Sequence, residues 1–269
     1  MTNILITGTS SGIGLETANF LKHQGYKVYA TARDIKSVEY LKSLGFDALV
    51  VDVTQPQTIE QCFKYILQKD NKIDVVFNNA GYGQPGAVED ISTTTLKKQF
   101  ETNVFGLHEV TIQALDIMKK QGYGKIIQHS SVLGLVSLKL RGAYSASKYA
   151  VEGLTDTLRL ELKDTNIDVT LLNTGPILSE FRNNAKTELE NNVDMKNSRF
   201  KTSYEKSLQS SKSDVPFTLE SIEVAKVVEK IILSNNVKPR YYITKATYIL
   251  GFLKRILSTN LLDKILNKI

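Results

Sequence analysis

The sequence predicts an α/β fold in which helices cover both faces of a doubly wound, parallel sheet of about seven strands. Two observations predict it. Apolar runs of strand length alternate with helical patterns along most of the chain, and the first run leads through a glycine-rich turn directly into a helix. Strands and helices that alternate in this way form a parallel sheet that is buried on both faces.

The composition limits the classes of protein that fit. With 269 residues, of which 42% are hydrophobic, the chain can form one large domain, which we assign to residues 1–245, and a helical tail at 246–269. Its single cysteine, Cys62, allows no internal disulfide and no cysteine-rich metal site, so no metal is predicted. One cysteine suits a reducing compartment. No secretory signal or apolar run of about 20 residues is recognisable, and we expect a cytoplasmic protein.

The positive charge is concentrated near the carboxyl end. Residues 241–269 contain five basic residues and one acidic residue, which leaves only +2 of the net charge of +6 for the rest of the chain. A nucleic-acid-binding surface needs a larger basic patch or a matching motif. Nucleic acid is therefore not a predicted partner.

A phosphate-binding turn is predicted after the first strand, residues 3–7. Gly8 permits a tight turn, Gly12 lets the backbone approach a pyrophosphate, and Gly14 lets the following helix pack closely on the strand. The helix N-terminus then faces the phosphate. The other turn residues that we assign to cofactor binding are Ser10, Ser11 and Ile13. This order of elements is typical of a Rossmann-like dinucleotide fold, although a glycine turn can also be purely structural.

The second predicted strand, residues 27–32, ends at Arg33. In dinucleotide folds an acidic residue at this place binds the adenosine ribose of NAD, whereas an arginine accommodates the 2′-phosphate of NADP. Arg33 therefore favours NADP(H) over NAD(H), with an exposed loop charge as the alternative. Asp34 follows directly, and we expect it either to pair with a cation or to cap the helix that begins near residue 35.

The third and fourth predicted strands, residues 47–51 and 73–77, flank a helix at 56–69 and also end in candidate cofactor residues. Asp52 and Val53 end the third strand, where a carboxylate can accept hydrogen bonds from an adenine amino group. Small residues after the fourth strand let the chain pass beneath a cofactor, and asparagine amides can satisfy turn backbone groups. The residues in this second set are Asn79, Ala80 and Gly81.

A helical pattern over residues 92–121 contains Asn103, a residue of poor helix propensity. Its presence predicts a local kink or a polar role. An asparagine that simply faces solvent is the alternative.

A candidate proton-transfer site follows the strand at residues 125–129. Ser130 and Ser131 come next, and the helix that continues to residue 162 carries Tyr144 and Lys148 four positions apart, so both side chains project from one face. A tyrosine with a pKa of about 10 is a poor acid or base at neutral pH, and we expect the neighbouring ammonium to lower that pKa. An ordinary pair on the helix surface also fits this spacing.

A strand near residues 167–172 is followed by a change of composition at 179–214, which is rich in polar residues. We interpret this segment as a partly helical cover over the site, with an ordinary surface loop as the alternative. A helix at 219–233 and a strand at 240–244 complete the predicted sheet.

The tail at 246–269 has helical periodicity, with one wide apolar face flanked by basic residues. A helix of this kind can lie on a membrane surface, cover the substrate cleft or dock against another subunit. Packing on its own domain is the plainest alternative. The sequence does not choose among these.

Together these segments resemble the short-chain dehydrogenase/reductase family over nearly the whole domain. The matching segments are residues 7–14, Asp52-Val53, Asn78-Asn79-Ala80-Gly81, Asn103, Ser131 and Tyr144-Ser145-Ala146-Ser147-Lys148. The family serine lies thirteen residues before the tyrosine, which selects Ser131 over Ser130. Residues 28–34 and Gly175-Pro176 resemble the subgroup of 17β-hydroxysteroid dehydrogenase type 1, retinol dehydrogenases and acyl-dihydroxyacetone-phosphate reductases, which handle lipophilic alcohols and ketones.

The resemblance implies a catalytic role for four residues. Tyr144 would donate a proton to the carbonyl oxygen of the substrate, and Ser131 would donate a second hydrogen bond to it. Lys148 would bind the nicotinamide ribose and lower the pKa of Tyr144, and Asn103 would hold a water that links Lys148 to solvent. Tyr144 and Lys148 thus count among the cofactor-binding residues too.

The resemblance also implies cofactor contacts at Pro176 and Ser179 and a homodimer through the helices that carry Asn103 and Tyr144. Ser179 replaces the usual threonine near the nicotinamide carboxamide. The implied function is NADP(H)-dependent hydride transfer to a lipophilic ketone or aldehyde, or from a secondary alcohol, with reduction favoured. An NAD-dependent alcohol dehydrogenase and a non-catalytic nucleotide sensor or scaffold are the alternatives.

Overall fold

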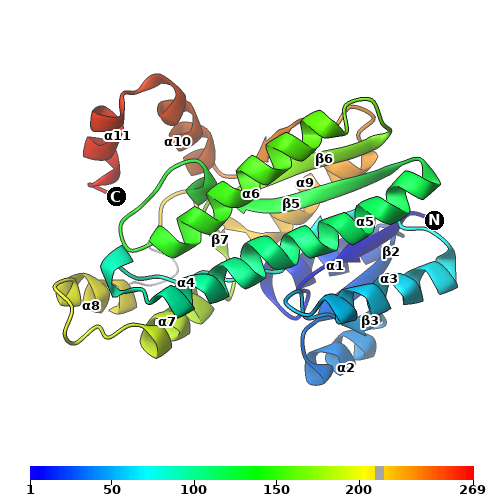
Figure 1. Ribbon diagram of the computed structural model, residues 1–269, viewed down its shortest axis with the longest axis horizontal. Coiled ribbons are helices and arrows are strands. Elements are labelled where there is room, and N and C mark those ends of the chain that lie inside the picture. Colours follow the sequence, from blue (N-terminus) through cyan, green and yellow to red (C-terminus); the bar gives the residue numbers. More distant parts are fainter. Residues whose placement is uncertain (210–214) are drawn as a thin grey trace.

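The computed structural model describes residues 1–209 and 215–269. Seven parallel strands form the main sheet, as the sequence predicts (Figure 1). Their order is β3 (Asp47–Val50), β2 (Lys27–Ala32), β1 (Asn3–Ile6), β4 (Val75–Asn78), β5 (Gly124–Ser131), β6 (Ile167–Thr174) and β9 (Arg240–Tyr242). The strand order reverses between β1 and β4, and doubly wound sheets bind their ligands at such a point.

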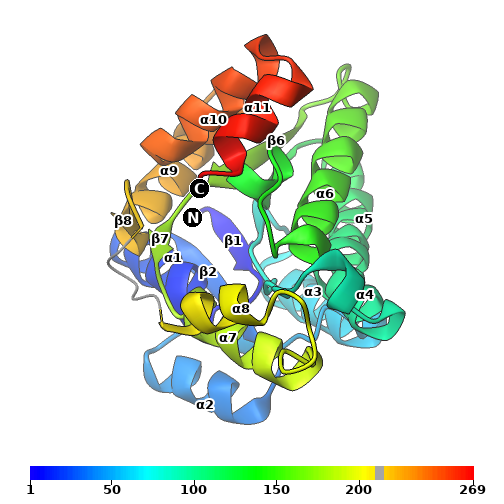
Figure 2. The ribbon, with the colours of Figure 1, turned by 90° about the vertical axis from the view of Figure 1, so that its left-hand side faces the viewer.

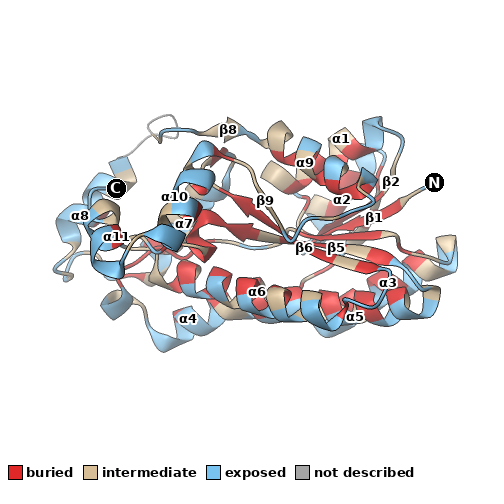
Figure 3. Cartoon of the chain, turned by 90° about the horizontal axis from the view of Figure 1, so that it is seen from above, coloured by how far each residue is buried: buried red, intermediate tan, exposed pale blue. Residues whose placement is uncertain are grey.

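Helices cover both faces of this sheet, which Figure 3 shows edge-on. One layer holds α1 (Gly12–His23), α2 (Ile35–Ser43) and α9 (Ser221–Leu233). The other holds α3 (Pro56–Asp70), α4 (Thr93–Phe100), α5 (Leu107–Gln121) and α6 (Gly142–Glu161). A π-helical turn, Glu101–Gly106, joins α4 to α5 and contains Asn103. The interruption predicted at this asparagine is therefore confirmed.

Strand β1 shows why both faces need cover. Ile4 and Ile6 pack in the core that includes α1 and α9, whereas Leu5 packs in the core that includes α3 and α5. Because side chains alternate between the two faces along a strand, a strand buried on both sides reads as a continuous apolar run. The two cores hold the carboxyl ends of β1, β4 and β5 in fixed positions.

Two short strands, β7 (Ile177–Leu178) and β8 (Leu219–Glu220), pair in parallel outside the main sheet. Between them lie α7 (Phe181–Asn192) and α8 (Lys201–Gln209), the helical parts of the 179–214 segment, whose residues 210–214 lie outside the described residues. β8 takes the first two residues of the helix predicted at 219–233, because the backbone N–H of Leu219 bonds the carbonyl of Pro176.

The tail is helical and forms two helices, α10 (Lys245–Ile256) and α11 (Thr259–Leu266), with a break between them (Figure 2). Leu257 is extended, and Ser258 is the N-cap residue of α11. The break brings Leu257 and Leu262 into one apolar cluster, and their burial favours it over a straight helix. Across the described residues, no helix is both long and apolar enough to cross a bilayer.

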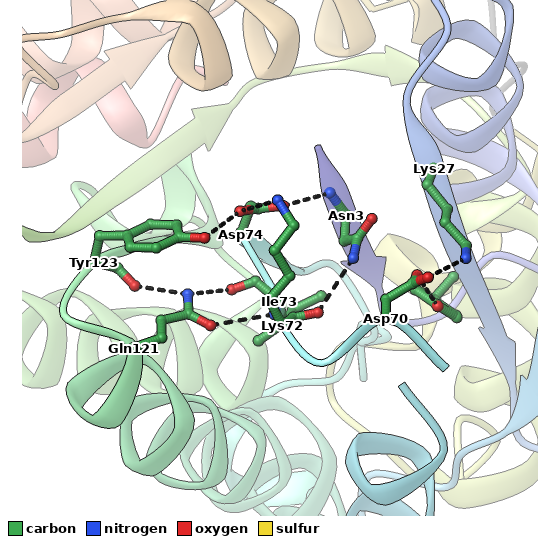
Figure 4. A network of polar contacts seen from close by, with 9 residues as sticks. Asn3, Lys27, Asp70, Lys72, Ile73, Asp74, Gln121 and Tyr123 are labelled. Atoms are coloured by element: carbon green, nitrogen blue, oxygen red, sulfur yellow. Dashed lines mark hydrogen bonds and ion pairs between the residues drawn. The ribbon is translucent and has the colours of Figure 1, made fainter. Parts of the chain in front are cut away.

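A polar network lies at the amino end of the sheet, opposite the edge that carries the candidate site (Figure 4). The Asp74 carboxylate accepts hydrogen bonds from the backbone N–H of Asn3 (2.7 Å) and the hydroxyl of Tyr123 (3.0 Å). The Gln121 side chain bonds both backbone groups of Ile73, at 3.3 and 2.7 Å. These contacts satisfy backbone groups where β4 begins, and thus serve the fold.

Candidate active site

The loops that leave β1, β4 and β5 lie side by side at the carboxyl edge of the sheet. β4 pairs in register with both β1 and β5. The hydroxyl of Thr7, directly after β1, accepts hydrogen bonds from the backbone N–H groups of Asn79 and Ala80, both at 3.0 Å. The glycine turn and the loop after β4 are therefore joined into one surface.

The glycine turn needs all three of its predicted glycines. Gly8 and Gly12 have φ angles of +70° and +59°, which side chains disfavour. A Cβ atom on Gly14 would lie 2.2 Å from the carbonyl oxygen of Gly8, so no side chain fits there. Ile13, between them, packs against the core beneath α1.

The start of α1 fits the phosphates of a dinucleotide. Ser11 is the N-cap residue, yet its side chain makes no capping hydrogen bond, and both Ser10 and Ser11 are exposed. Helix N-termini attract anions through their N–H groups and dipole. The amide nitrogen of Asn79 donates to the carbonyls of Thr7 (3.0 Å) and Gly8 (2.9 Å), which holds the turn in shape.

Arg33 is exposed and follows β2, whose end is joined to the glycine turn by a hydrogen bond from the Thr9 N–H to the Thr31 carbonyl (2.8 Å). Its neighbour Asp34 caps α2 by accepting hydrogen bonds from the backbone N–H of Ser37 (2.8 Å) and from the Ser37 hydroxyl (2.7 Å). Of the two expectations for Asp34, the cap is the one observed. The cap's hydrogen bonds, foremost that from the Ser37 N–H, lower the pKa of Asp34, and the nearby Arg33 adds to this.

Asp52 and Val53 follow β3 as predicted. The Asp52 carboxylate accepts hydrogen bonds from the backbone N–H (2.9 Å) and the hydroxyl (2.8 Å) of Thr54. Val53 is buried against the π-helical turn, and a Cβ atom on Gly106 would lie 2.7 Å from it. This close approach sets the distance between the β3 loop and the start of α5.

Asn103 is fully buried in the π-helical turn, so the solvent-facing alternative does not hold. Its amide nitrogen donates to the Tyr82 carbonyl (2.9 Å) and the Ser147 hydroxyl (3.3 Å), and its oxygen accepts from the Tyr82 N–H (3.1 Å). A Cβ atom on Gly81 would lie 3.0 Å from that oxygen. Asn103 therefore ties the loop after β4 to the helix that carries the tyrosine.

Ser131, Tyr144 and Lys148 come together at the end of β5. The Nζ atom of Lys148 lies 5.7 Å from the centre of the Tyr144 ring and donates to the carbonyl of His129 at 2.7 Å. The Ser131 oxygen accepts from the backbone N–H of Leu133 at 3.1 Å, which leaves its hydroxyl proton free to donate. Serine, tyrosine and lysine thus form one cluster.

The pKa of Tyr144 differs from the expectation. Burial raises this pKa to about 12, and a hydrogen bond with Ser131 opposes the rise, so the predicted net lowering by Lys148 is wrong. The reason is that the phenol is itself removed from water, which disfavours the charged phenolate. Burial also lowers the pKa of Lys148 to about 8, against an upward effect of Glu152. Tyr144 therefore holds its proton at neutral pH.

Glu152 is a buried member of the site that the sequence analysis missed. Its carboxylate accepts hydrogen bonds from the Ser130 hydroxyl, the Asn173 amide (2.6 Å) and the Arg240 guanidinium (3.1 Å). Burial raises the pKa of Glu152, and these partners oppose the rise. Ser130 thus points away from Tyr144. The signal was present in the sequence, because Glu152 lies one helical turn beyond Lys148 on the same face.

His129 is the second residue that the sequence analysis missed. Its Nδ1 atom lies 3.1 Å from Oδ1 of Asn79, and its Nε2 atom lies 3.2 Å from the hydroxyl of Thr174. An amide oxygen only accepts, so Nδ1 carries the proton and Nε2 accepts from Thr174. Burial, with the Lys148 charge, lowers the pKa of His129 to about 3, which keeps the ring neutral. Its place within an apolar run hid this role.

Apolar side chains pack against the ring of Tyr144. The ring of Phe181, at the start of α7, lies 5.5 Å from it, centre to centre. Tyr144 also packs against a cluster built from the Val132–Gly134 turn and the two tail helices. A substrate that reaches Tyr144 therefore meets hydrocarbon surface.

Pro176 and Ser179 stand on either side of β7, at the entrance to α7. The Ser179 oxygen accepts from the backbone N–H of Phe181 at 3.4 Å. A Cβ atom on Gly12 would lie 3.4 Å from Cβ of Ser179, so this segment returns to the glycine turn. The predicted cofactor residues from both ends of the domain thus share one surface.

Residues 2–190 match the family model described as short chain dehydrogenase. The chain belongs to this family. The short-chain dehydrogenase is 37% identical over 265 residues to the uncharacterized oxidoreductase YbbO of Escherichia coli, a match that covers 98% of this chain and 93% of that protein. It is 40% identical over 181 residues to a 3-ketodihydrosphingosine reductase of Bacteroides thetaiotaomicron, which covers 67% of this chain and 66% of that one.

Solved structures that hold a nicotinamide cofactor superpose on the protein. ElxO with NADP bound is 26% identical with a TM-score of 0.74, and the match covers 90% of this chain and 96% of ElxO. A member from Burkholderia phymatum in complex with NAD has a TM-score of 0.79 at 24% identity, with 99% and 95% covered, which establishes the shared fold. The protein is thus an oxidoreductase of the short-chain dehydrogenase family, and the neighbours bind either nicotinamide cofactor.

Replacing Glu152 by glutamine tests its influence on Lys148. The Glu152 carboxylate raises the pKa of Lys148, so the neutral glutamine lowers that pKa and Lys148 loses its proton at lower pH. We expect the alkaline limb of the kcat profile to move about one unit toward lower pH.

Asp156→Asn is the matched control, because Asp156 binds the same Arg240 one helical turn further along α6. Its pH profile should stay in place. An unchanged alkaline limb in a folded Glu152→Gln protein contradicts the role given to Glu152.

Proposed function

We propose that the protein is an NADP(H)-dependent oxidoreductase that reduces a lipophilic ketone or aldehyde to the alcohol. The observation that carries the proposal is the cluster of Ser131, Tyr144 and Lys148 beside a dinucleotide-type glycine turn. A protein that only binds a nucleotide, or serves as a scaffold, has no need of a proton donor at this place. An NAD-dependent alcohol dehydrogenase would use the same residues in the opposite direction.

Each residue of the cluster has a distinct task in this proposal. Tyr144 gives its phenolic proton to the carbonyl oxygen, and its pKa of about 12 means that the proton is present at neutral pH. Ser131 donates a second hydrogen bond to the same oxygen and stabilises the negative charge that forms there. The nicotinamide cofactor supplies the hydride.

Lys148 and Asn103 have supporting tasks in the proposal. The ammonium of Lys148 binds the nicotinamide ribose in this proposal. Asn103 assists the return of a proton from solvent to Lys148 through water. Its burial and its hydrogen bond to Ser147, the neighbour of Lys148 in the chain, support this assignment.

The lipophilic character of the substrate is inferred from the surroundings of Tyr144. Phe181 and the apolar cluster of the tail flank the ring, and such surfaces favour apolar ligands. In the proposal α7 and α8, within the segment 179–214, cover the bound substrate. The name of one relative, 3-ketodihydrosphingosine reductase, also supports the reduction of a lipid ketone.

The preference for NADP(H) over NAD(H) is inferred from Arg33. Its guanidinium is exposed at the end of β2, where an arginine can bind the 2′-phosphate. Asp34 caps α2, so Arg33 is the charged residue that would contact the adenosine ribose of the cofactor. Asp52 and Val53 lie next to this end and would contact the adenine.

The change Tyr144→Phe removes the proposed proton donor, together with its hydrogen bond to Ser131, and keeps the aromatic ring. We expect kcat for carbonyl reduction to fall by about 10² to 10⁴-fold while NADPH binding, followed by fluorescence, stays nearly unchanged. Tyr149→Phe is the control, because Tyr149 lies on the same helix and its hydroxyl bonds the backbone of Leu135. Equal activity of the Tyr144→Phe and Tyr149→Phe proteins would contradict the assignment of Tyr144 as the proton donor.

The change Arg33→Ser tests the cofactor preference. A charge-assisted contact to phosphate contributes about 1.5–3 kcal/mol, so the Kd for NADPH should rise about tenfold to a hundredfold while that for NADH barely changes. Lys42→Ser removes an exposed charge from the far end of α2 and should affect neither. Tighter binding of NADH than NADPH by the unaltered protein refutes the preference.

The proposal includes a homodimer, in the cytoplasm, formed through α5 and α6. These helices border a groove of about 280 Å³, and Ile112 and Leu154 on its walls are 40% and 45% exposed. Burying such side chains against a second copy is favourable. Sedimentation equilibrium should find a dimer for the protein and a monomer for Leu154→Glu, and a monomeric unaltered protein rules the arrangement out.

A further inference from the structure

The tail helices use one side to pack on the domain. Apolar residues of α10 and α11 join the Val132–Gly134 turn and Tyr144 in a single cluster. The tail residues in that cluster are Leu250, Leu253, Leu257, Leu262 and Leu266. Figure 2 shows the two helices side by side at the end of the sheet where the strands finish. The tail thus forms one wall beside the candidate catalytic residue.

The other side of α10 is apolar as well, and it is exposed. Tyr248, Phe252 and Ile256 are 59%, 61% and 57% exposed, and Ile249 beside them is 48% exposed. The first three lie four residues apart, so they form a continuous stripe along the helix. Four large apolar side chains on one exposed helix face are unusual for a surface that meets only water.

The exposed side of α11 repeats this pattern. Leu261 and Ile269 are 47% and 71% exposed, and Ile265 lies between them on the same face. An apolar face therefore continues from the first tail helix to the second. We call the set Tyr248, Ile249, Phe252, Ile256, Leu261 and Ile269 the outer tail face.

Basic residues border the outer tail face. Five exposed cations lie on these two helices or just after them, and none forms an ion pair with a described residue. They are Lys245, Lys254, Arg255, Lys264 and Lys268, against the single acidic Asp263. The tail therefore carries +4 of the chain's net charge of +6, and these exposed cations can interact with an anionic partner.

We propose that α10 and α11 dock the protein on the surface of an anionic lipid bilayer, with the outer tail face among the acyl chains near the headgroups. An amphipathic helix with aromatic and aliphatic residues on one side and cations at its border binds such a surface. A second copy fits less well, because a two-fold contact between two such faces would bring like charges together.

The docking surface gives the tail a use in catalysis, and this part rests on the proposed function. The inner sides of the same helices pack against Tyr144, while their outer sides meet the lipid. A lipophilic carbonyl dissolved in the bilayer would therefore lie close to the candidate site without crossing bulk water. The bilayer would serve as the store of substrate.

Flotation of the full-length protein tests the proposal. The protein should float with vesicles of phosphatidylcholine and phosphatidylglycerol in equal parts and much less with phosphatidylcholine alone. The double variant Phe252→Gln, Ile256→Gln should bind at least about tenfold more weakly. The double variant Lys264→Gln, Lys268→Gln should lose about fivefold for each charge.

Matched controls change the same kinds of residue away from the tail. Leu233→Gln alters a side chain that is 67% exposed at the end of α9, and the double variant Lys119→Gln, Lys120→Gln removes two exposed charges from α5. Both should float as the unaltered protein does. Absence of flotation, or equal flotation of tail and control variants, overturns the proposal.

Two further measurements separate the explanations. A dimer in sedimentation that the Phe252→Gln, Ile256→Gln protein no longer forms assigns the outer tail face to a second copy and overturns lipid docking. NADPH oxidation with a water-soluble ketone, measured without vesicles, should be equal in tail variants and unaltered protein. Flotation without any turnover rejects the proposed function alone, whereas turnover without flotation rejects the docking surface alone.

Discussion

The hydrogen bond from the buried ammonium of Lys148 to the carbonyl of His129 is the contact on which the site depends. A buried charge is costly unless polar partners surround it. The carbonyl of His129 is one such partner, and the carboxylate of Glu152, one turn along α6, favours the charged form of Lys148. Together they fix the helix against β5. Tyr144, one turn before Lys148, is thereby held at the end of the strand.

The same strand end connects catalysis with the cofactor turn. The backbone carbonyl of His129 accepts a hydrogen bond from Lys148, and its ring is hydrogen-bonded to Asn79. The amide of Asn79 in turn donates hydrogen bonds to the carbonyls of Thr7 and Gly8. Burial disfavours a protonated His129, and the charge of Lys148 adds to this effect, which is why the pKa of His129 is low. A neutral ring of fixed tautomer therefore links the two halves of the site.

Features that depend only on residues close together in the sequence could be predicted from it. The glycine turn, the seven strands, the irregular turn at Asn103 and the shared face of Tyr144 and Lys148 follow from spacing and propensity. Glu152 and the pKa of Tyr144 could not be predicted, because both depend on burial by segments distant in sequence. The charge of Lys148 near Tyr144 could be recognised from the sequence, whereas the burial of Tyr144 could not.

The tail shows the limit of periodicity most clearly. A single apolar stripe is explained by packing on the domain, but α10 and α11 are apolar on two sides. In the sequence both sides merge into one wide face, so packing on the domain, cleft cover, membrane contact and docking against another subunit were all open interpretations. The structure separates the two sides: Leu253 and Leu262 pack against the domain, whereas Phe252 on α10 and Leu261 on α11 are exposed. One face thus supports Tyr144, and the other needs an explanation beyond the fold.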